Sequence, residues 1–355
     1  MIVHQWVPAA HRGDAVGDHA RRVRDVLREW GHESEIFAMS IDPSLEHEIR
    51  HWEEPEARDG DLTMLHFATA SPMSAAFGTM PGARVLHYHN VTPARFFAPF
   101  GGGLARVSAT SRLELAALAG RVDLAYGASE FSRRELDDLG FAHTAVLPIL
   151  MDLDRLRQAP PVPALESMLD DGLTNILFVG RIAPNKRIED HIRLAEHYRR
   201  YVDAHYRFIF VGRYDVVPGY YESVRAMAAT YQMLPERFWF VGAVPDEELA
   251  AYYRHAHAYV SLSEHEGFCV PIVEAMAMDV PVLAYADTAV PETLGGAGVS
   301  FRPKDLEFAA ELLGGLIYDE PFRHGVLDGQ RARVRAFGRG QVEPVLRDML
   351  EIVTT

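Results

Sequence analysis

The chain has 355 residues, of which 48% are hydrophobic, 24% charged and 10% aromatic. These values are ordinary for a globular protein, and they exclude a largely disordered, collagen-like or disulfide-stabilised chain. At roughly 100–200 residues per domain, the length predicts two domains. The net charge of −15 argues against nucleic acid as a partner, although a local basic pocket can still hold a small anion.

The cellular compartment is predicted from three further features of the sequence. No stretch approaches the ~18 consecutive apolar residues of a membrane-spanning helix. The first residues lack the basic start and apolar core of a signal peptide. Cys269 is the one cysteine, so the chain has no internal disulfide. We therefore expect a cytoplasmic protein.

Short apolar runs alternate with longer stretches of helical periodicity, and they fall into two series. The expected strands of the first series are Ile2–Val7, Ser34–Ala38, Leu62–Phe67, Arg84–His89, Val122–Tyr126 and Thr144–Pro148. Those of the second series are Asn175–Val179, Arg207–Val211, Phe238–Val241, Ala258–Leu262, Val280–Tyr285 and Gly298–Phe301. Such runs are typical of strands that are buried on both faces in a parallel sheet covered by helices.

The two series predict two doubly wound α/β domains, spanning residues 1–155 and 173–335. Between them, the proline-containing segment Met151–Gly172 is expected to be the interdomain linker. Ligands of such sheets bind beyond the carboxyl ends of the strands. The tripeptide Phe-Val-Gly ends the first three strands of the second series, and glycine there allows a sharp turn and close approach of a ligand.

A basic loop follows the first strand of the second series. It runs from Gly180 to Arg187 and contains Arg181 and Lys186, ahead of a helical stretch. Cations at a helix N-terminus are typical of a phosphate site, although solvated loop charges would give the same local pattern. Only Lys186 and Lys304 are lysines. The loop lacks the Walker A pattern, so a P-loop is excluded.

A second motif, Ser263–Ala277, follows the fourth strand of that series. Pro271 suits the first turn of a helix, which places Glu274 within the helix and Glu266 in the loop before it. A helical path between the two glutamates would separate them by about 12 Å, beyond the roughly 5–10 Å between the two carboxylates of glycoside hydrolases. The plain alternative is a solvated Glu266 and a Glu274 that caps its helix.

These motifs resemble those of retaining glycosyltransferases of family 4. The pattern Glu266, seven residues, Glu274, with Gly267, Phe268 and Pro271 between, looks like that family's signature. The loop that begins at Gly180 is similar to the family's diphosphate loop. The resemblance implies a GT-B fold, in which two Rossmann-like domains face a central cleft. It also implies that the terminal helix, residues 341–353, returns to the N-terminal domain.

The resemblance implies roles for the C-terminal motifs. Gly180, Arg181 and Lys186 would bind the donor's diphosphate. Glu274 would bind its ribose hydroxyls.

The remaining donor contacts implied by the resemblance concern the sugar and the base. Glu266, with the backbone of Gly267 and Phe268, would hold the sugar and the distal phosphate. The base would lie against the loop from Val241 to Val244.

The N-terminal half adds a glycine loop and a histidine pair. Gly13 and Gly17 resemble the family's glycine-rich first loop, but three residues separate them where the family has paired glycines. They also do not form a dinucleotide fingerprint. The family likeness points to His89 as the histidine that contacts the transferred sugar, with His87 as the alternative.

Metal binding and nucleophilic catalysis are two other chemistries that histidine and cysteine side chains offer. His87 and His89 form a His-x-His pair, but no nearby cysteine or carboxylate completes a zinc site, so we expect no metal. Cys269 is expected to be a small buried hydrophobe and not a nucleophile.

The sequence and this resemblance together predict a metal-independent glycosyltransferase that moves a hexose-type sugar from a UDP- or GDP-sugar to a hydroxyl acceptor. The resemblance implies that the reaction is retaining. Arg181, Lys186, Glu266 and His89 are its expected catalytic residues. No cofactor is expected, since the nucleotide sugar is a substrate. The alternatives are an epimerase or phosphorylase of the same fold, or a non-catalytic nucleotide-sugar-binding protein.

The acceptor is expected to be a small molecule or a lipid-linked glycan. An aromatic, glycine-rich stretch, Arg95–Gly103, and the arginines of the first helix suggest at most a weak contact with a membrane surface. A locally packed loop and a solvated helix face are the favoured explanation of these features.

Overall fold

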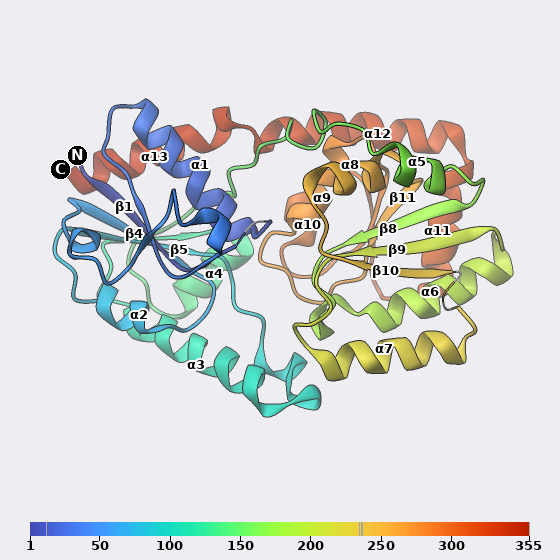
Figure 1. Cartoon of the computed structure of the whole chain (residues 1–355), viewed down its shortest axis with the longest axis horizontal. Helices are drawn as coiled ribbons and strands as arrows, with labels where there is room; N and C mark the ends of the chain where they lie inside the picture. The colour runs from blue at the N-terminus through green and yellow to red at the C-terminus, as the bar shows by residue number, and fades with distance from the viewer. Residues whose placement is uncertain (12, 234, 236, 355) are drawn as a thin grey trace. The chain divides into compact units, whose positions relative to one another are not determined.

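The computed structural model describes residues 1–11, 13–233, 235 and 237–354. The chain divides into two compact units (Figure 1). Unit 1 comprises Met1–Met151 and Phe337–Thr355, and unit 2 comprises Asp152–Ala336. Each unit is a parallel sheet with helices on both faces, as the alternation of strands and helices predicts.

The sheet of unit 1 has the strand order β3-β2-β1-β4-β5-β6-β7, with all neighbours parallel. Its strands are β1 Val3–Ala10, β2 Ile36–Ile41, β3 Arg50–His51, β4 Leu62–Phe67, β5 Ala83–Tyr88, β6 Leu124–Gly127 and β7 Thr144–Val146. Its α-helices are α1 Ala15–Glu29, α2 Pro72–Phe77, α3 Gly102–Leu118, α4 Glu130–Asp138 and α13 Arg339–Thr354.

Alternate side chains of these strands enter cores on opposite faces of the sheet. In β4, Met64 packs with α1 and α13, whereas Leu65 packs with α2, α3 and α4. Both side chains are completely buried. The strand sequences are therefore apolar throughout, because neither face meets water.

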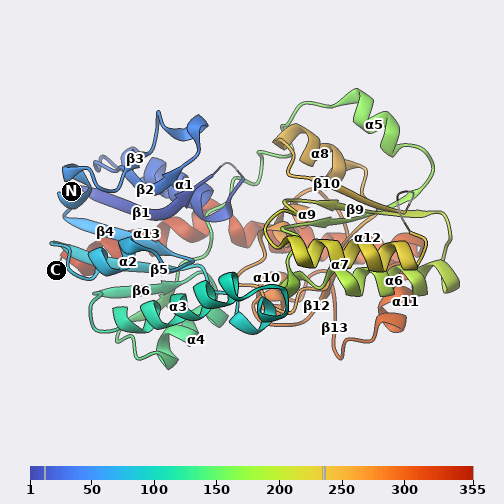
Figure 2. The same ribbon diagram turned by 60° about the horizontal axis from the view of Figure 1, so that its bottom comes forward.

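The sheet of unit 2 has the strand order β10-β9-β8-β11-β12-β13, again parallel. Its strands are β8 Thr174–Val179, β9 Tyr206–Val211, β10 Phe238–Gly242, β11 Ala258–Ser261, β12 Val282–Tyr285 and β13 Val299–Phe301. Its α-helices are α5 Pro163–Leu169, α6 Ile188–Tyr201, α7 Pro218–Thr230, α8 Asp246–Arg254, α9 Val270–Ala277, α10 Val290–Leu294, α11 Leu306–Tyr318 and α12 Glu320–Val334. Helices α6 and α7 cover one face, and α8 and α9 the other (Figure 2).

Both sheets reverse their strand order at one place. The reversal lies between β1 and β4 in unit 1 and between β8 and β11 in unit 2. Loops that leave neighbouring strands there diverge to opposite faces and open a crevice, which is the usual ligand site of doubly wound sheets. This topology places the basic loop after β8 beside the glutamate motif after β11.

All twelve expected strands are present, with ends within about two residues in most cases. The strand β3 was not predicted, because an edge strand of only two residues gives no pattern in the sequence. The expected linker is also wrong in part. Residues 152–172 belong to unit 2, where Arg157 donates to the Ala277 carbonyl and the helix α5 begins at Pro163.

The terminal helix α13 completes the core of unit 1. Val342, Leu346, Met349 and Leu350 pack with apolar residues of α1, β1 and β4. This confirms the expected return of the C-terminus to the N-terminal unit. Among the described residues, no helix combines the length and the apolar character that crossing a membrane requires.

We predict that Leu346→Ala destabilises unit 1 by about 2–5 kcal/mol, the usual range for truncating a buried leucine. Leu346 is completely buried, whereas Ile352 on the same helix is 57% exposed. The control variant Ile352→Ala should change stability by less than about 0.5 kcal/mol. Urea denaturation followed by tryptophan fluorescence is a suitable measurement, because Trp6, Trp30 and Trp52 all lie in unit 1. Equal midpoints for the two variants would contradict this account of α13.

Candidate functional site

In unit 2, the loops that follow β8 and β11 are joined through Asn185. Its backbone carbonyl accepts from the Glu264 N–H at 2.8 Å, and its side-chain amide donates to the His265 carbonyl at 3.0 Å. Asn185 is only 6% exposed, so water competes little for these bonds. The two motifs found in the sequence are therefore one structural assembly.

Lys186 and Glu266 form an ion pair across this junction. The Lys186 Nζ lies 2.5 Å from the Glu266 Oε1, and both side chains are largely buried. The Glu266 N–H donates to the Thr288 hydroxyl at 2.9 Å, which fixes the backbone that carries the carboxylate. The pair thus presents one cation and one acceptor at the carboxyl ends of β8 and β11.

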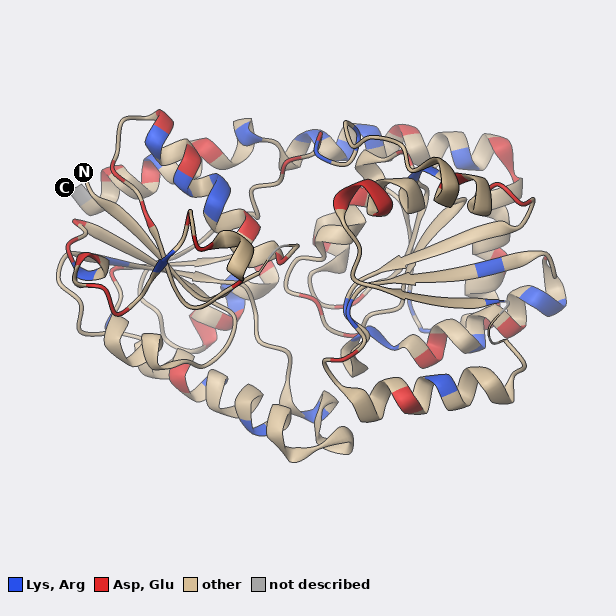
Figure 3. Ribbon diagram, viewed as in Figure 1, with Lys and Arg blue, Asp and Glu red and all other residues tan. Residues whose placement is uncertain are grey.

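Arg181 and Gly180 occupy the start of the same loop. Arg181 is exposed and forms no ion pair with the residues that the structure describes. Gly180 has φ +150° and packs against Gly212, whose own φ is +139°. Figure 3 shows basic ribbon in the loops at this end of the sheet. An exposed guanidinium and a largely buried lysine on one loop are well suited to a diphosphate.

Glu274 lies in α9 and is largely buried. It accepts from Arg155 at 2.8 Å and from the Tyr253 hydroxyl at 3.2 Å. Burial raises the pKa of Glu274, and the Arg155 guanidinium opposes that shift. Arg155 also pairs with Asp246 at the start of α8. Sequence reasoning missed Arg155, because it lies in the segment expected to be a linker.

The remaining candidates for the donor site lie in the loop before α9 and at the end of β10. Gly267 and Phe268 lie in the loop between β11 and α9, and Val241 and Val244 lie at the end of β10 and in the turn that follows. Cys269 caps α9 in the left-handed conformation, with φ +74°. Burial raises the pKa of its thiol, which agrees with the expected apolar role and not with a nucleophile.

The second lysine also lies near this junction. Lys304 Nζ contacts Asp190 at 2.8 Å and Glu264 at 2.9 Å, and it lies 4.6 Å from the centre of the Tyr285 ring. These contacts hold the first turn of α6 to the β11 loop. Both lysines of the chain therefore tie the same loops together.

In unit 1, the glycine loop differs from the expectation. The helix α1 begins at Ala15, so Gly17 lies inside its first turn and not in a loop. The Gly17 N–H donates to the Asp14 carboxylate at 3.1 Å, which caps the helix. Gly13 precedes the cap, with φ +71°. Of the two glycines, only Gly13 therefore belongs to the turn.

Four histidines gather at the carboxyl ends of β4 and β5. The His19 Nε2 lies 3.1 Å from the His87 Nδ1, and the His66 Nδ1 lies 3.0 Å from the His89 Nε2. Burial lowers the pKa of all four far below the usual value, that of His87 to about 3. All four rings are therefore neutral near pH 7.

Three of these histidines, His19, His66 and His87, have nitrogens close enough to share a metal ion. The hydrogen bonds of His19 do not fit that role. Its Nδ1 accepts from the Leu150 N–H at 2.8 Å, so its one proton lies on Nε2, the atom that faces His87. A protonated nitrogen cannot ligate a metal, and the cluster is better described as a hydrogen-bonded network.

The arginines of α1 are occupied by contacts within unit 1. Each donates to a carboxylate or a backbone carbonyl of that unit: Arg21, Arg22, Arg24 and Arg28. Phe96, Phe97 and Phe100, in the aromatic stretch, are partly buried around two short 3₁₀ helices. Both observations favour the simpler explanation over a membrane-binding surface.

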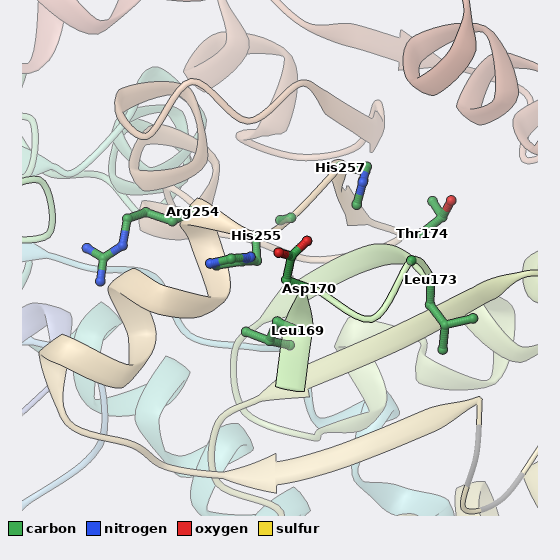
Figure 4. Close-up of a pocket in the computed structure, with 9 residues that line it drawn as sticks. Leu169, Asp170, Leu173, Thr174, Arg254, His255 and His257 are labelled. Carbon is green, nitrogen blue, oxygen red and sulfur yellow. The ribbon is translucent and has the colours of Figure 1, made fainter. Parts of the chain in front are cut away.

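A separate pocket of about 350 Å³ lies at the opposite end of the unit 2 sheet (Figure 4). It is lined by residues around Thr174, which begins β8, and His257, which precedes β11. Arg254 there is paired with Glu166. Because the strands are parallel, this is their amino end, and the pocket is not part of the candidate site.

Part of the chain matches a known domain family and several known proteins. Residues 166–331 match the family model described as Glycosyl transferases group 1. The serotype-specific mannosyltransferase WbdA of Escherichia coli is 29% identical over 147 residues, which are 41% of this chain and 18% of that protein. The MMP alpha-(1->4)-mannosyltransferase of Mycolicibacterium hassiacum is 38% identical over 97 residues, 26% of this chain and 23% of that protein. The matched part thus spans less than a quarter of the length of these relatives.

Solved structures match over the whole chain. A sucrose-phosphate synthase from Thermosynechococcus elongatus superposes with a TM-score of 0.78 at 17% identity, covering 100% of this chain and 99% of that one. Anabaena HepE in complex with UDP-glucose gives 0.77 at 16% identity, covering 99% and 100%. The chain therefore has the GT-B fold, and its residues 166–331 carry a domain of the Glycosyl transferases group 1 type. Membership of family 4 stays a prediction.

We predict that Gly212→Ala destabilises the protein by about 1–3 kcal/mol, because its Cβ would overlap backbone. That atom would lie 2.2 Å from the Gly180 carbonyl oxygen, in a conformation with φ +139°. Gly329→Ala on α12 is the matched control, since a Cβ there meets nothing within 4 Å. The control should stabilise by about 0.5–1 kcal/mol through the higher helix propensity of alanine. Thermal unfolding of both variants tests this difference, and a Gly212→Ala protein as stable as wild type would contradict it.

Proposed function

We propose that the protein is a hexosyltransferase that moves a hexose-type sugar from a UDP- or GDP-sugar to a hydroxyl acceptor. The observation that carries this proposal is the Lys186–Glu266 ion pair, on the same loop as the exposed Arg181, where the strand order of unit 2 reverses. Cations that converge at a reversal point suit a nucleoside diphosphate. The Glycosyl transferases group 1 match covers the same unit.

The proposed roles follow from charge. Arg181 and Lys186 bind the diphosphate, together with the positive amino end of α9. Glu266 accepts hydrogen bonds from the sugar, and Glu274 from the ribose. When Lys186 binds phosphate, the pair with Glu266 loosens and the carboxylate becomes available to the sugar.

Roles are also proposed for three further parts of the chain: His89, Gly13 and the loop from Val241 to Val244. His89 contacts the transferred sugar, Gly13 borders the site, and the loop holds the base. A hydrogen-bond argument favours His89 over His87. Both ring nitrogens of His87 are already bonded, one to His19 and one to the Leu147 carbonyl.

The proposed reaction breaks the bond between the sugar C1 and the phosphate oxygen, and the nucleoside diphosphate leaves with the electron pair. The acceptor oxygen forms the new bond to C1, and its proton passes to the departing phosphate. The cations stabilise the charge that develops on the leaving group. The reaction proceeds with retention and draws on no divalent metal.

The names of the relatives suggest which sugar and which acceptor to test. WbdA and the O-antigen chain mannosyltransferase B of Escherichia coli, 43% identical over 68 residues, are both named as mannosyltransferases. GDP-mannose is accordingly the first donor to test, followed by UDP-glucose. The acceptor is a hydroxyl of a small molecule or of a lipid-linked glycan.

A panel of nucleotide sugars tests the proposal directly. A donor present at 100 times its Kd should stabilise the folded protein by about 2.7 kcal/mol and raise its melting temperature. The donor that produces the largest shift is then incubated with glycan acceptors, and the products are analysed by mass spectrometry. A panel of UDP- and GDP-hexoses with neither a shift nor transfer would overturn the proposal.

We predict that Lys186→Ala lowers turnover by roughly 10²–10³, the usual loss for one preorganised charge stabiliser. Arg199→Ala is the control, because Arg199 is an exposed cation on α6 that pairs only with Glu196 among the described residues. The control should keep wild-type turnover. Melting curves are needed for both variants, since Lys186→Ala leaves Glu266 without its partner. Wild-type turnover in a folded Lys186→Ala protein would sink the phosphate assignment.

We also predict an α-linked product from an α-linked donor, formed at an undiminished rate in EDTA. Arg181, Lys186 and the backbone dipoles supply the counter-charge that a divalent ion would otherwise provide. Proton NMR of the fresh product identifies the anomer. A β-linked product, or activity that EDTA abolishes and magnesium or manganese restores, would contradict this mechanism.

A further inference from the structure

The three buried histidines of unit 1 and the partly buried His89 form two separate hydrogen-bonded chains, and each chain ends on a backbone group. These ends fix the position of every ring proton, because a backbone N–H can only donate and a carbonyl can only accept. One chain is closed at both ends. The other stops at a nitrogen of His89.

The closed chain joins two backbone groups that follow β7. The Leu150 N–H donates to the His19 Nδ1, the His19 Nε2–H donates to the His87 Nδ1, and the His87 Nε2–H donates to the Leu147 carbonyl at 2.9 Å. Both rings carry their proton on Nε2. No ring nitrogen of this chain remains unbonded.

The open chain starts at the Ala20 carbonyl. The side-chain amide of Gln5 donates to that carbonyl at 2.9 Å, so its Oε1 faces the His66 Nε2, also at 2.9 Å. An oxygen accepts, and therefore His66 carries its proton on Nε2 and accepts at Nδ1. The partner at Nδ1 is the His89 Nε2, at 3.0 Å, which must then be protonated.

The chain leaves the His89 Nδ1 as an unprotonated acceptor. This atom is buried and has no hydrogen-bond partner among the described residues. A buried acceptor without a partner costs free energy that a suitable donor would recover. His89 directly follows β5, at the carboxyl edge of the sheet where ligands of this fold bind.

We propose that Gln5 and His66 are positioning residues that hold His89 as the Nε2–H tautomer, so that its Nδ1 accepts a hydrogen bond from a hydroxyl of a bound sugar. This inference rests on the proposed function for its ligand. It assigns a direction to the hydrogen bond, from the sugar to the protein. Gln5 and His66 act on the sugar only through His89.

NMR of protein labelled with ¹⁵N-histidine tests the tautomer in the whole chain without any ligand. Two-bond couplings in the imidazole rings separate protonated from unprotonated nitrogens, and His89→Gln identifies the signals of His89. We expect Nε2 protonated and Nδ1 unprotonated in wild type. A wild-type His89 that is protonated on Nδ1, or stoichiometric zinc in the purified protein, would overturn the proposal.

Two variants at position 66 form a matched pair. His66→Phe keeps the ring shape but removes the acceptor, whereas the Oδ1 of His66→Asn takes the place of Nδ1 as an acceptor. His89 should become a mixture of tautomers in the first variant and stay Nε2–H in the second. Should His66→Phe not fold, Gln5→Met keeps all four rings and frees the proton of His66. It should give the same mixture, and an unchanged His89 in both folded variants would overturn the proposal.

Calorimetry tests the proposed hydrogen bond between His89 and the sugar. The measured quantity is the ratio of the affinity for a nucleotide sugar to the affinity for the nucleoside diphosphate alone, called the gain below. The probes are UDP-glucose against UDP and GDP-mannose against GDP. His66→Phe should reduce this gain about five- to tenfold, as expected for one lost hydrogen bond. It should leave the affinity for UDP and GDP unchanged, and His66→Asn should restore the gain.

The two measurements separate failure of this inference from failure of the proposed function. A gain that is equal in wild type and His66→Phe overturns the positioning role, while sugar transfer can still be demonstrated. A wild-type protein that binds none of the four probes overturns the proposed function together with the sugar contact. The NMR experiment then still decides the tautomer of His89.

Discussion

The junction between the loops after β8 and β11 is the constraint on which the candidate site depends. Asn185 bonds one loop to the other with both its backbone and its side chain, and Lys186 and Glu266 pair directly beside it. Two opposite charges are thus held in a largely buried place, where each would be costly without the other. A ligand with phosphate and hydroxyl groups would offer the lysine and the glutamate alternative partners. The ion pair can therefore serve ligand binding as well as the stability of the fold.

The two units share a strand order but differ in the chemistry at its point of reversal. Unit 2 places lysine, arginine and glutamate there, whereas unit 1 places neutral imidazoles whose protons are fixed by backbone groups. Charged groups suit a phosphate that is itself charged. Neutral rings in a dry environment suit the uncharged hydroxyls of a sugar. The same topology therefore carries charged side chains in one unit and uncharged rings in the other.

The sequence predicted the strands well, because runs buried on both faces are apolar without interruption. It also singled out Lys186, Glu266 and Glu274 as candidates, because charged side chains after the ends of buried strands are recognisable from residue type and position alone. It did not find Arg155 or Thr288, because nothing in their local sequence shows that they reach Glu274 and Glu266. His66 was missed as well. In the sequence, His66 is a single polar residue within an apolar strand. Its position next to His87 follows only from the register of β4 and β5.

The return of α13 to unit 1 has a consequence for synthesis of the chain. Unit 1 is interrupted in sequence by the whole of unit 2, and four buried side chains of its core come from Val342–Leu350. Chains are made from the N-terminus at about 5–20 residues per second, and domains generally fold as units in that order. In this chain the N-terminal unit cannot be completed before the C-terminal helix α13 has been made. The unit that leaves the ribosome first is completed last, after unit 2 already has all of its residues.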